Sequence, residues 1–158
     1  MKRSILYIIV CLALVLTGSL PFRGHDVGKL RPVETIAVSG GEVVTLRTDM
    51  GDVGSGRSWA DALEDLEKTA PGAIFQGTVS YILLEDSGED LLGTILSQED
   101  LNPGCGICLA PEGVDPEKAG EYLRAHEPGE NLRSLRGKEL YELPRLIGSE
   151  GRFYLVQP

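Results

Sequence analysis

The sequence predicts an α/β (α+β) fold in which three main helices flank a mixed β-sheet and a hydrophobic helix precedes them. Three observations carry this prediction. Short β-branched runs alternate with amphipathic segments, turns rich in Gly and Pro separate these runs, and hairpin signatures lie near both ends of the folded part. The expected order is ββ-α-β-α-β-α-ββ, and the hairpins make the sheet mixed rather than purely parallel.

The N-terminus has the pattern of a secretory signal. Lys2 and Arg3 form a positive region, and the twelve residues Ile5–Leu16 that follow carry no charge. The stretch LTGS at 16–19 is similar to the approach to a bacterial lipoprotein cysteine, but Ser19 stands at the cysteine's place. Lipidation is not expected, because a serine hydroxyl is far less nucleophilic than a partly ionised thiol.

Two fates of this leader stay open. Thr17 and Ser19 are small residues at the positions that ordinary signal peptidase reads, which favours cleavage and release. Alternatively, Ile5–Phe22 forms roughly 27 Å of helix at ~1.5 Å per residue and anchors the chain in a hydrocarbon core of about 30 Å. Residues 1–22 are therefore a signal peptide or an N-terminal membrane anchor, and the rest of the chain is extracytoplasmic.

The chain beyond the leader fits one domain. Residues 23–32 form a polar linker, and residues 33–158 form a single extracytoplasmic α/β domain that can bury a core. The formal charge of −9 includes Lys2 and Arg3, so the exported part carries about −11. An acidic surface of this kind repels nucleic acid, which excludes nucleic acid as a partner.

The first half of the domain is expected to begin with a hairpin. Its strands are Val33–Val38 and Val43–Arg47 around the turn SGGE, and the glycine-rich segment 49–57 is expected to be a loop. A helix then starts at an N-cap, Ser58, and carries apolar residues at helical spacing until Pro71 ends it. These apolar residues are Trp59, Ala62, Leu63 and Leu66.

A central strand is expected over Ala73–Leu84, bent at Gly77, followed by a second helix that opens at Ser87 and ends before the sequence NPG. The run Gly104–Ala110 predicts another strand. A third helix starts at Asp115 with Pro at its first position and ends at Pro128.

After this helix, residues 130–136 are expected to add a helical turn. Two closing strands over Leu140–Ile147 and Arg152–Val156 then surround the turn GSEG.

One region resembles a known family. The segment GSGRSWADALEDLEKTAPGAIFQGTVSYILLEDS has a glycine-containing loop, a helix with a Pro-interrupted end and a strand with an aromatic-apolar run, and a second helix and strand follow. This order is similar to the N-terminal domain of the C subunit of spore germinant receptors, the Ger(x)C family. The resemblance covers roughly residues 33–135 and is one of pattern.

The resemblance implies a non-enzymatic interaction module associated with spore germination in a Gram-positive bacterium. Family members are lipoproteins at the spore membrane that work with membrane subunits, so the implied partner is a membrane or envelope protein. This sequence departs from the family at Ser19, where the lipoprotein cysteine is expected. The further domains that normally follow are also not found before Pro158.

An enzymatic alternative rests on the sequence CGIC. Cys105 and Cys108 have the CxxC spacing of a thiol-disulfide oxidoreductase, which needs its first thiol at a helix N-terminus. In a strand, residues three apart point to opposite faces, so these two thiols would not pair readily. Two buried apolar residues are the competing interpretation.

A cation-binding envelope protein is the remaining alternative, because Asp49 and Asp52 lie in a Gly-rich loop that could wrap a cation. No twelve-residue calcium loop matches the sequence. A Cys₂His₂ zinc site is not expected either, since His25 and His126 lie far apart along the chain. We therefore expect no catalytic residue, no metal and no cofactor.

Overall fold

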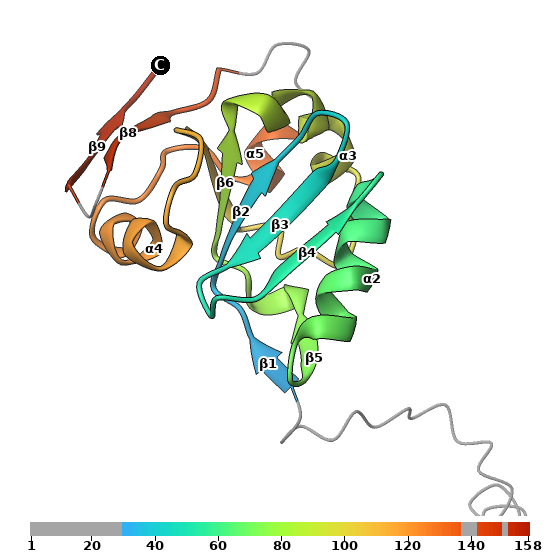
Figure 1. Cartoon of the computed structure of the whole chain (residues 1–158). Helices are drawn as coiled ribbons and strands as arrows, with labels where there is room; N and C mark the ends of the chain where they lie inside the picture. The colour runs from blue at the N-terminus through green and yellow to red at the C-terminus, as the bar shows by residue number, and fades with distance from the viewer. Residues whose placement is uncertain (1–29, 137–141, 150–151) are drawn as a thin grey trace, which may run out of the picture.

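The computed structural model describes residues 30–136, 142–149 and 152–158, and it has a mixed α/β fold (Figure 1). A seven-stranded mixed sheet has the order β4-β3-β2-β6-β7-β8-β9. Strands β2, β6, β7 and β8 are parallel, while β3, β4 and β9 run antiparallel to their neighbours. The strands are β2 Thr35–Ser39, β3 Val44–Thr48, β4 Val53–Gly56, β6 Tyr81–Glu85, β7 Gly106–Ala110, β8 Arg145–Ser149 and β9 Arg152–Val156.

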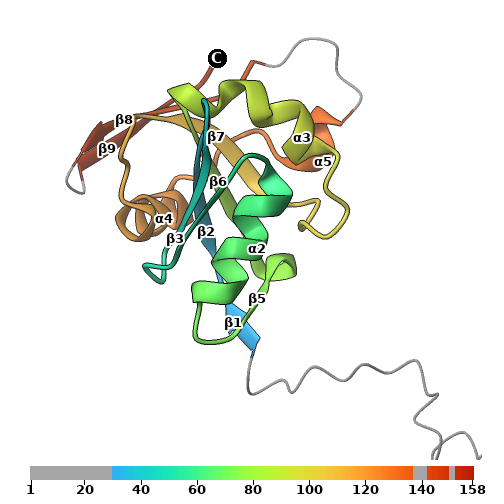
Figure 2. The ribbon, with the colours of Figure 1, turned by 45° about the vertical axis from the view of Figure 1, so that its right-hand side comes forward.

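Helices cover both faces of this sheet (Figure 2). On one face lie α2 Trp59–Thr69, α3 Leu92–Leu96 and α5 Leu132–Leu135, and on the other lies α4 Pro116–Ala125. Alternation along β6 supplies both cores, because Ile82 and Leu84 face the first layer while Leu83 faces α4. A separate parallel pair, β1 Leu30–Pro32 and β5 Ala73–Phe75, lies beyond the sheet.

The two longer helices start where the sequence indicates. The hydroxyl of Ser58 accepts a hydrogen bond from the Asp61 N–H at 3.2 Å, so it caps α2. The carboxylate of Asp115 accepts from the N–H groups of Glu117 and Lys118 and caps α4, with Pro116 in the first helical turn.

The first hairpin and the helical turn near residue 132 are also confirmed. The strand predicted over Gly104–Ala110 is present but begins at Gly106, so Cys105 lies just before it. The closing hairpin is present as well, but its first strand begins at Arg145, and residues 142–144 are not part of a strand.

Two strand predictions are wrong. The segment predicted as a loop contains β4, whose glycines let α2 approach the strand directly. The predicted central strand over residues 73–84 is divided into β5, a 3₁₀ turn at Gln76–Thr78 and β6. The hydroxyl of Thr78 donates to the carbonyl oxygens of Phe75 at 2.8 Å and Val33 at 3.1 Å, which stabilises the break.

The second predicted helix is shorter than expected. It consists of a 3₁₀ segment, η3 Asp86–Leu91, followed by the five residues of α3. The predicted linker includes β1 at its end. The leader at 1–22, His25 in the linker and the start of the predicted strand at 140–141 lie outside the described residues. Within the described part of the chain, no helix has the length and apolar character needed to span a membrane.

Candidate interaction surface

The β8–β9 hairpin exposes one of its two faces. Strict alternation places Leu146 and Phe153 toward α4, in the second core. The opposite face, which we call the outer face, consists of Arg145, Ile147, Arg152, Tyr154 and Val156, and all five are exposed. In the register, Ile147 pairs with Tyr154 and Arg145 pairs with Val156, so the apolar side chains are neighbours.

These exposed apolar residues are large. Ile147 is 49 % exposed, Val156 is 49 % exposed and Tyr154 is 69 % exposed. A cluster of large apolar side chains flanked by polar groups is typical of a protein–protein contact, and Tyr and Arg are enriched at such contacts.

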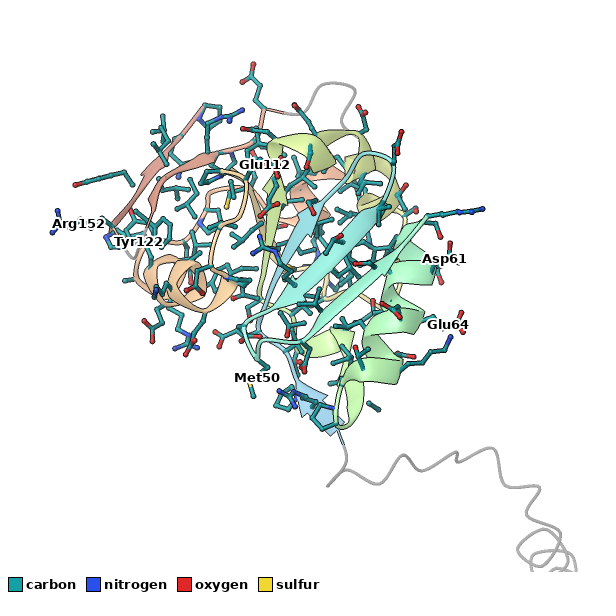
Figure 3. The ribbon with its side chains drawn as sticks, in the orientation of Figure 1. Met50, Asp61, Glu64, Glu112, Tyr122 and Arg152 are labelled. Carbon is teal, nitrogen blue, oxygen red and sulfur yellow. The ribbon has the colours of Figure 1, made fainter. Side chains whose placement is uncertain are left out.

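The hairpin is fixed from behind by Tyr122 of α4. Its hydroxyl accepts a hydrogen bond from the Leu155 N–H at 3.1 Å, and its ring lies 6.0 Å from that of Phe153. The ring of His126 stacks on Tyr122 with centroids 4.3 Å apart. Figure 3 shows Tyr122 between α4 and the hairpin, with Arg152 at the outer end. The outer face is therefore presented on an ordered support.

Positive charge flanks the apolar cluster on an otherwise acidic molecule of net charge −9. The guanidinium of Arg145 forms an ion pair with Asp86 at 2.7 Å. Arg152 forms no ion pair with any residue that the structure describes. An arginine without a partner can pair with a carboxylate of another protein.

The two cysteines of the CGIC sequence lie in different cores. Cys105 packs in the core beneath α2 and α3, and Cys108 packs in the core beneath α4. Both are free thiols, and burial raises the pKa of each to about 12, with the neighbouring Cys108 adding to the effect on Cys105. A redox cysteine needs a lowered pKa and access to its substrate. This environment opposes thiol redox chemistry.

The two aspartates of the proposed cation loop are used by the fold. Both carboxylate oxygens of Asp49 accept from the Glu34 N–H, at 3.2 and 3.3 Å, and burial raises the Asp49 pKa. Asp52 forms an ion pair with Arg31 at 2.9 Å. Among the residues described, no group of three or more His, Cys, Asp or Glu side chains could hold a metal ion.

A buried acid at the carboxyl end of β6 was not anticipated from the sequence. Glu85 pairs with Arg47 and accepts from the Gly113 N–H at 3.0 Å. Burial raises the Glu85 pKa, whereas hydrogen bonds from Ser87 lower that of the adjacent Glu112. Ligands often bind at this end of a parallel sheet, but here protein groups already satisfy both carboxylates. We interpret Glu85 and Glu112 as structural residues, because the hydrogen bonds that they accept from Gly113 and Ser87 connect the end of β6 and the segment after it with the segment after β7.

No protein-family model, no curated protein and no solved structure matches the chain.

Proposed function

We propose that this protein is a non-enzymatic interaction module that docks onto a membrane or envelope protein through the outer face of the β8–β9 hairpin. The observation that carries the proposal is the exposed apolar cluster of Ile147, Tyr154 and Val156, flanked by two arginines. Burying such a cluster releases water from apolar surface. Arg152, which has no ion-pair partner among the described residues, adds a directional contact to a carboxylate, whereas Arg145 is already paired with Asp86.

The chemistry of the cluster defines the partner. An acidic domain repels other acidic surfaces, so the basic hairpin is the part that an acidic partner can approach most closely. The partner surface should therefore combine apolar and acidic side chains. The partner is expected to contact the outer face rather than extend the sheet, because Tyr122 already occupies the Leu155 N–H at the edge.

The compartment and biological role rest on the sequence. The charged start and apolar run at 1–22 support export, with the leader either cleaved or kept as a hydrophobic anchoring helix. The resemblance to the germinant receptor C subunit supports a role in spore germination with a membrane protein partner. The same resemblance supports the more detailed fold that we propose, in which three main helices flank the sheet in the order ββ-α-β-α-β-α-ββ.

Photo-crosslinking in cells that naturally contain the full chain tests the docking proposal. A photoreactive residue at position 154 should give an adduct with an extracytoplasmic membrane or envelope protein, identified by mass spectrometry of the purified adduct. The same residue at position 64, which points to solvent from α2 on the other side of the molecule, is the matched control.

Charge reversal completes this test. Arg152→Glu should abolish the adduct from position 154, because it places like charges in the contact. Adducts only with a second copy of the chain, only with cytoplasmic proteins, or equally from positions 64 and 154 would contradict the proposal.

A further inference from the structure

A polar pocket lies at the amino ends of β6 and β7, away from the outer face of the hairpin. Its volume is about 260 Å³, just below the ~300 Å³ at which pockets for drug-sized ligands begin. A ligand that fills it is therefore small. The side chains that matter for the argument are Ser80, Tyr81, Asn102, Glu127, Pro128 and Asn131.

Backbone hydrogen bonds fix the walls of this pocket. The Gly106 N–H donates to the Ser80 carbonyl oxygen at 2.8 Å, and the Leu132 N–H donates to that of Cys105 at 3.0 Å. A Cβ atom on Gly106 would lie 2.7 Å from Pro128 Cγ. The glycine therefore allows the segment after α4 to close against the start of β7, and the pocket has a defined shape before any ligand binds.

Tyr81 supplies a hydroxyl without a protein partner. The residue as a whole is only 9 % exposed, and its hydroxyl forms no hydrogen bond with any described residue. The hydroxyl is not among the buried polar atoms that lack a partner, so it is open to solvent at the pocket that Tyr81 lines. A polar ligand in the pocket would replace water as its hydrogen-bond partner.

Glu127 supplies a negative charge at the rim. Its carboxylate forms no ion pair or hydrogen bond within the part of the chain that the structure describes. The cation closest along the helix, Arg124, is already bound to Glu34 at 2.8 Å. Tyr81 and Glu127 line the same pocket. Burial raises the Tyr81 pKa most, and the negative charges of Glu127 and Glu34 raise it further.

Two amides add neutral donors. The side-chain oxygen of Asn102 accepts from the Gly104 N–H at 2.9 Å, and that of Asn131 accepts from the Ser134 N–H at 2.9 Å. These contacts orient both amides and leave their NH₂ groups without a partner among the described residues. The pocket thus combines one carboxylate with several neutral hydrogen-bonding groups.

We propose that this pocket binds a small hydroxylated ammonium compound, an amino sugar or an amino alcohol. The ammonium group would pair with Glu127, and the hydroxyls would bind Tyr81 and the two amides. The apolar face of the ligand would lie against Pro128 and the Tyr81 ring. This site is separate from the outer face of the hairpin, so either proposal can fail alone.

Binding of glucosamine to the full chain, followed by calorimetry or by NMR shifts, tests this assignment. Glucose is the matched neutral probe. Glucosamine should bind at least about tenfold more tightly than glucose, because only glucosamine offers a charge-assisted bond to Glu127. Glu127→Gln should remove this preference, whereas Glu121→Gln, at an exposed position of α4, should preserve it.

The hydroxyl is tested separately with Tyr81→Phe. This variant should lose about fivefold in glucosamine affinity and keep its melting temperature, because the hydroxyl has no protein partner to lose. Equal affinity for glucosamine and glucose, equal effects of the two glutamate variants, or no binding of glucosamine would each overturn the assignment.

Discussion

The two edge strands of the sheet differ in how far a helix covers them. At the β4 edge, the Ser55 N–H donates to the Asp65 carboxylate at 2.9 Å and the Thr69 hydroxyl donates to the Val53 carbonyl oxygen at 3.1 Å. Both partners come from α2, which lies directly on the strand (Figure 1). At the β9 edge, the only hydrogen bond with α4 among the described residues is the one that the Tyr122 hydroxyl accepts from the Leu155 N–H, and the outer face of the hairpin stays exposed.

This difference separates a structural edge from an available surface. Exposed strand edges promote association with other chains, and proteins usually cover or charge them. Here α2 supplies hydrogen-bond partners to Val53 and Ser55 of β4 and packs directly on the strand. The β8–β9 hairpin instead receives enough support to hold its shape while its apolar face remains free. The contrast is the structural reason for assigning interaction to the hairpin.

The largest effect is expected where β4 meets α2. A Cβ atom on Gly54 would lie 2.3 Å from the Ala62 carbonyl oxygen and 2.4 Å from the Leu66 N atom. Gly54→Ala should therefore lower the free energy of unfolding by about 3 kcal/mol, since helix and strand must separate. Urea denaturation measures this change.

A helical glycine provides the matched control for this variant. A Cβ atom on Gly93 of α3 would meet nothing within 4 Å, so Gly93→Ala should be neutral or stabilising by up to ~1 kcal/mol. Equal stability of the two alanine variants would show that α2 does not seal the β4 edge closely.

The next largest loss of stability is expected when the hydrogen bond between Asp65 of α2 and the β4 backbone is removed. Asp65→Ala removes the acceptor of the Ser55 N–H and should cost about 1.5 kcal/mol. It should also promote self-association in sedimentation experiments, because the strand edge becomes available. Glu64→Ala is the control. It loses only an exposed i,i+4 ion pair with Lys68, worth about 0.3 kcal/mol. A similar cost for both variants would argue against the capping role.

A smaller effect is expected at the opposite edge. Tyr122→Phe leaves the Leu155 N–H without its acceptor but keeps the aromatic contacts with Phe153 and His126. The cost should be about 1 kcal/mol, and hydrogen exchange at the Leu155 amide should become faster. Tyr154→Phe should change neither quantity, because the Tyr154 side chain is largely exposed. Unchanged exchange in Tyr122→Phe would mean that α4 does not anchor the hairpin.

Local sequence signals predicted much of the architecture. The SGGE turn predicted the first hairpin, and the N-cap residues Ser58 and Asp115 predicted where α2 and α4 begin. Each of these features depends on interactions between residues close in the chain. They are the kind of signal that a single sequence carries most clearly.

The missed elements depend on contacts between distant residues. Glycine disfavours a strand in isolation, yet Gly54 belongs to β4 because α2 needs the space that a side chain would fill. The break before β6 depends on the Thr78 hydroxyl reaching Val33, which lies 45 positions earlier. Neither requirement is visible in local composition.

The candidate surface was only half predictable for the same reason. Alternation in Arg152–Val156 indicates which side chains share a face. It does not indicate which face a helix will cover. That depends on α4 lying against Phe153, while Tyr154 stays 69 % exposed. The pocket likewise joins Tyr81 of β6 to Glu127 after α4, and no local motif links these positions.

The smallest effect on stability should accompany the loss of docking. Replacing Ile147 and Tyr154 together by Ser removes one exposed cross-strand pair, which should lower the free energy of unfolding by less than ~1 kcal/mol. The same double variant should no longer co-purify with the partner identified by crosslinking from position 154, because the centre of the apolar cluster is gone. Asp65→Ala should show the reverse pattern, with lower stability and intact co-purification. If the double variant kept the partner, or if it unfolded as readily as Gly54→Ala, the hairpin would be a structural part of the core and the distinction between the two edges would fail.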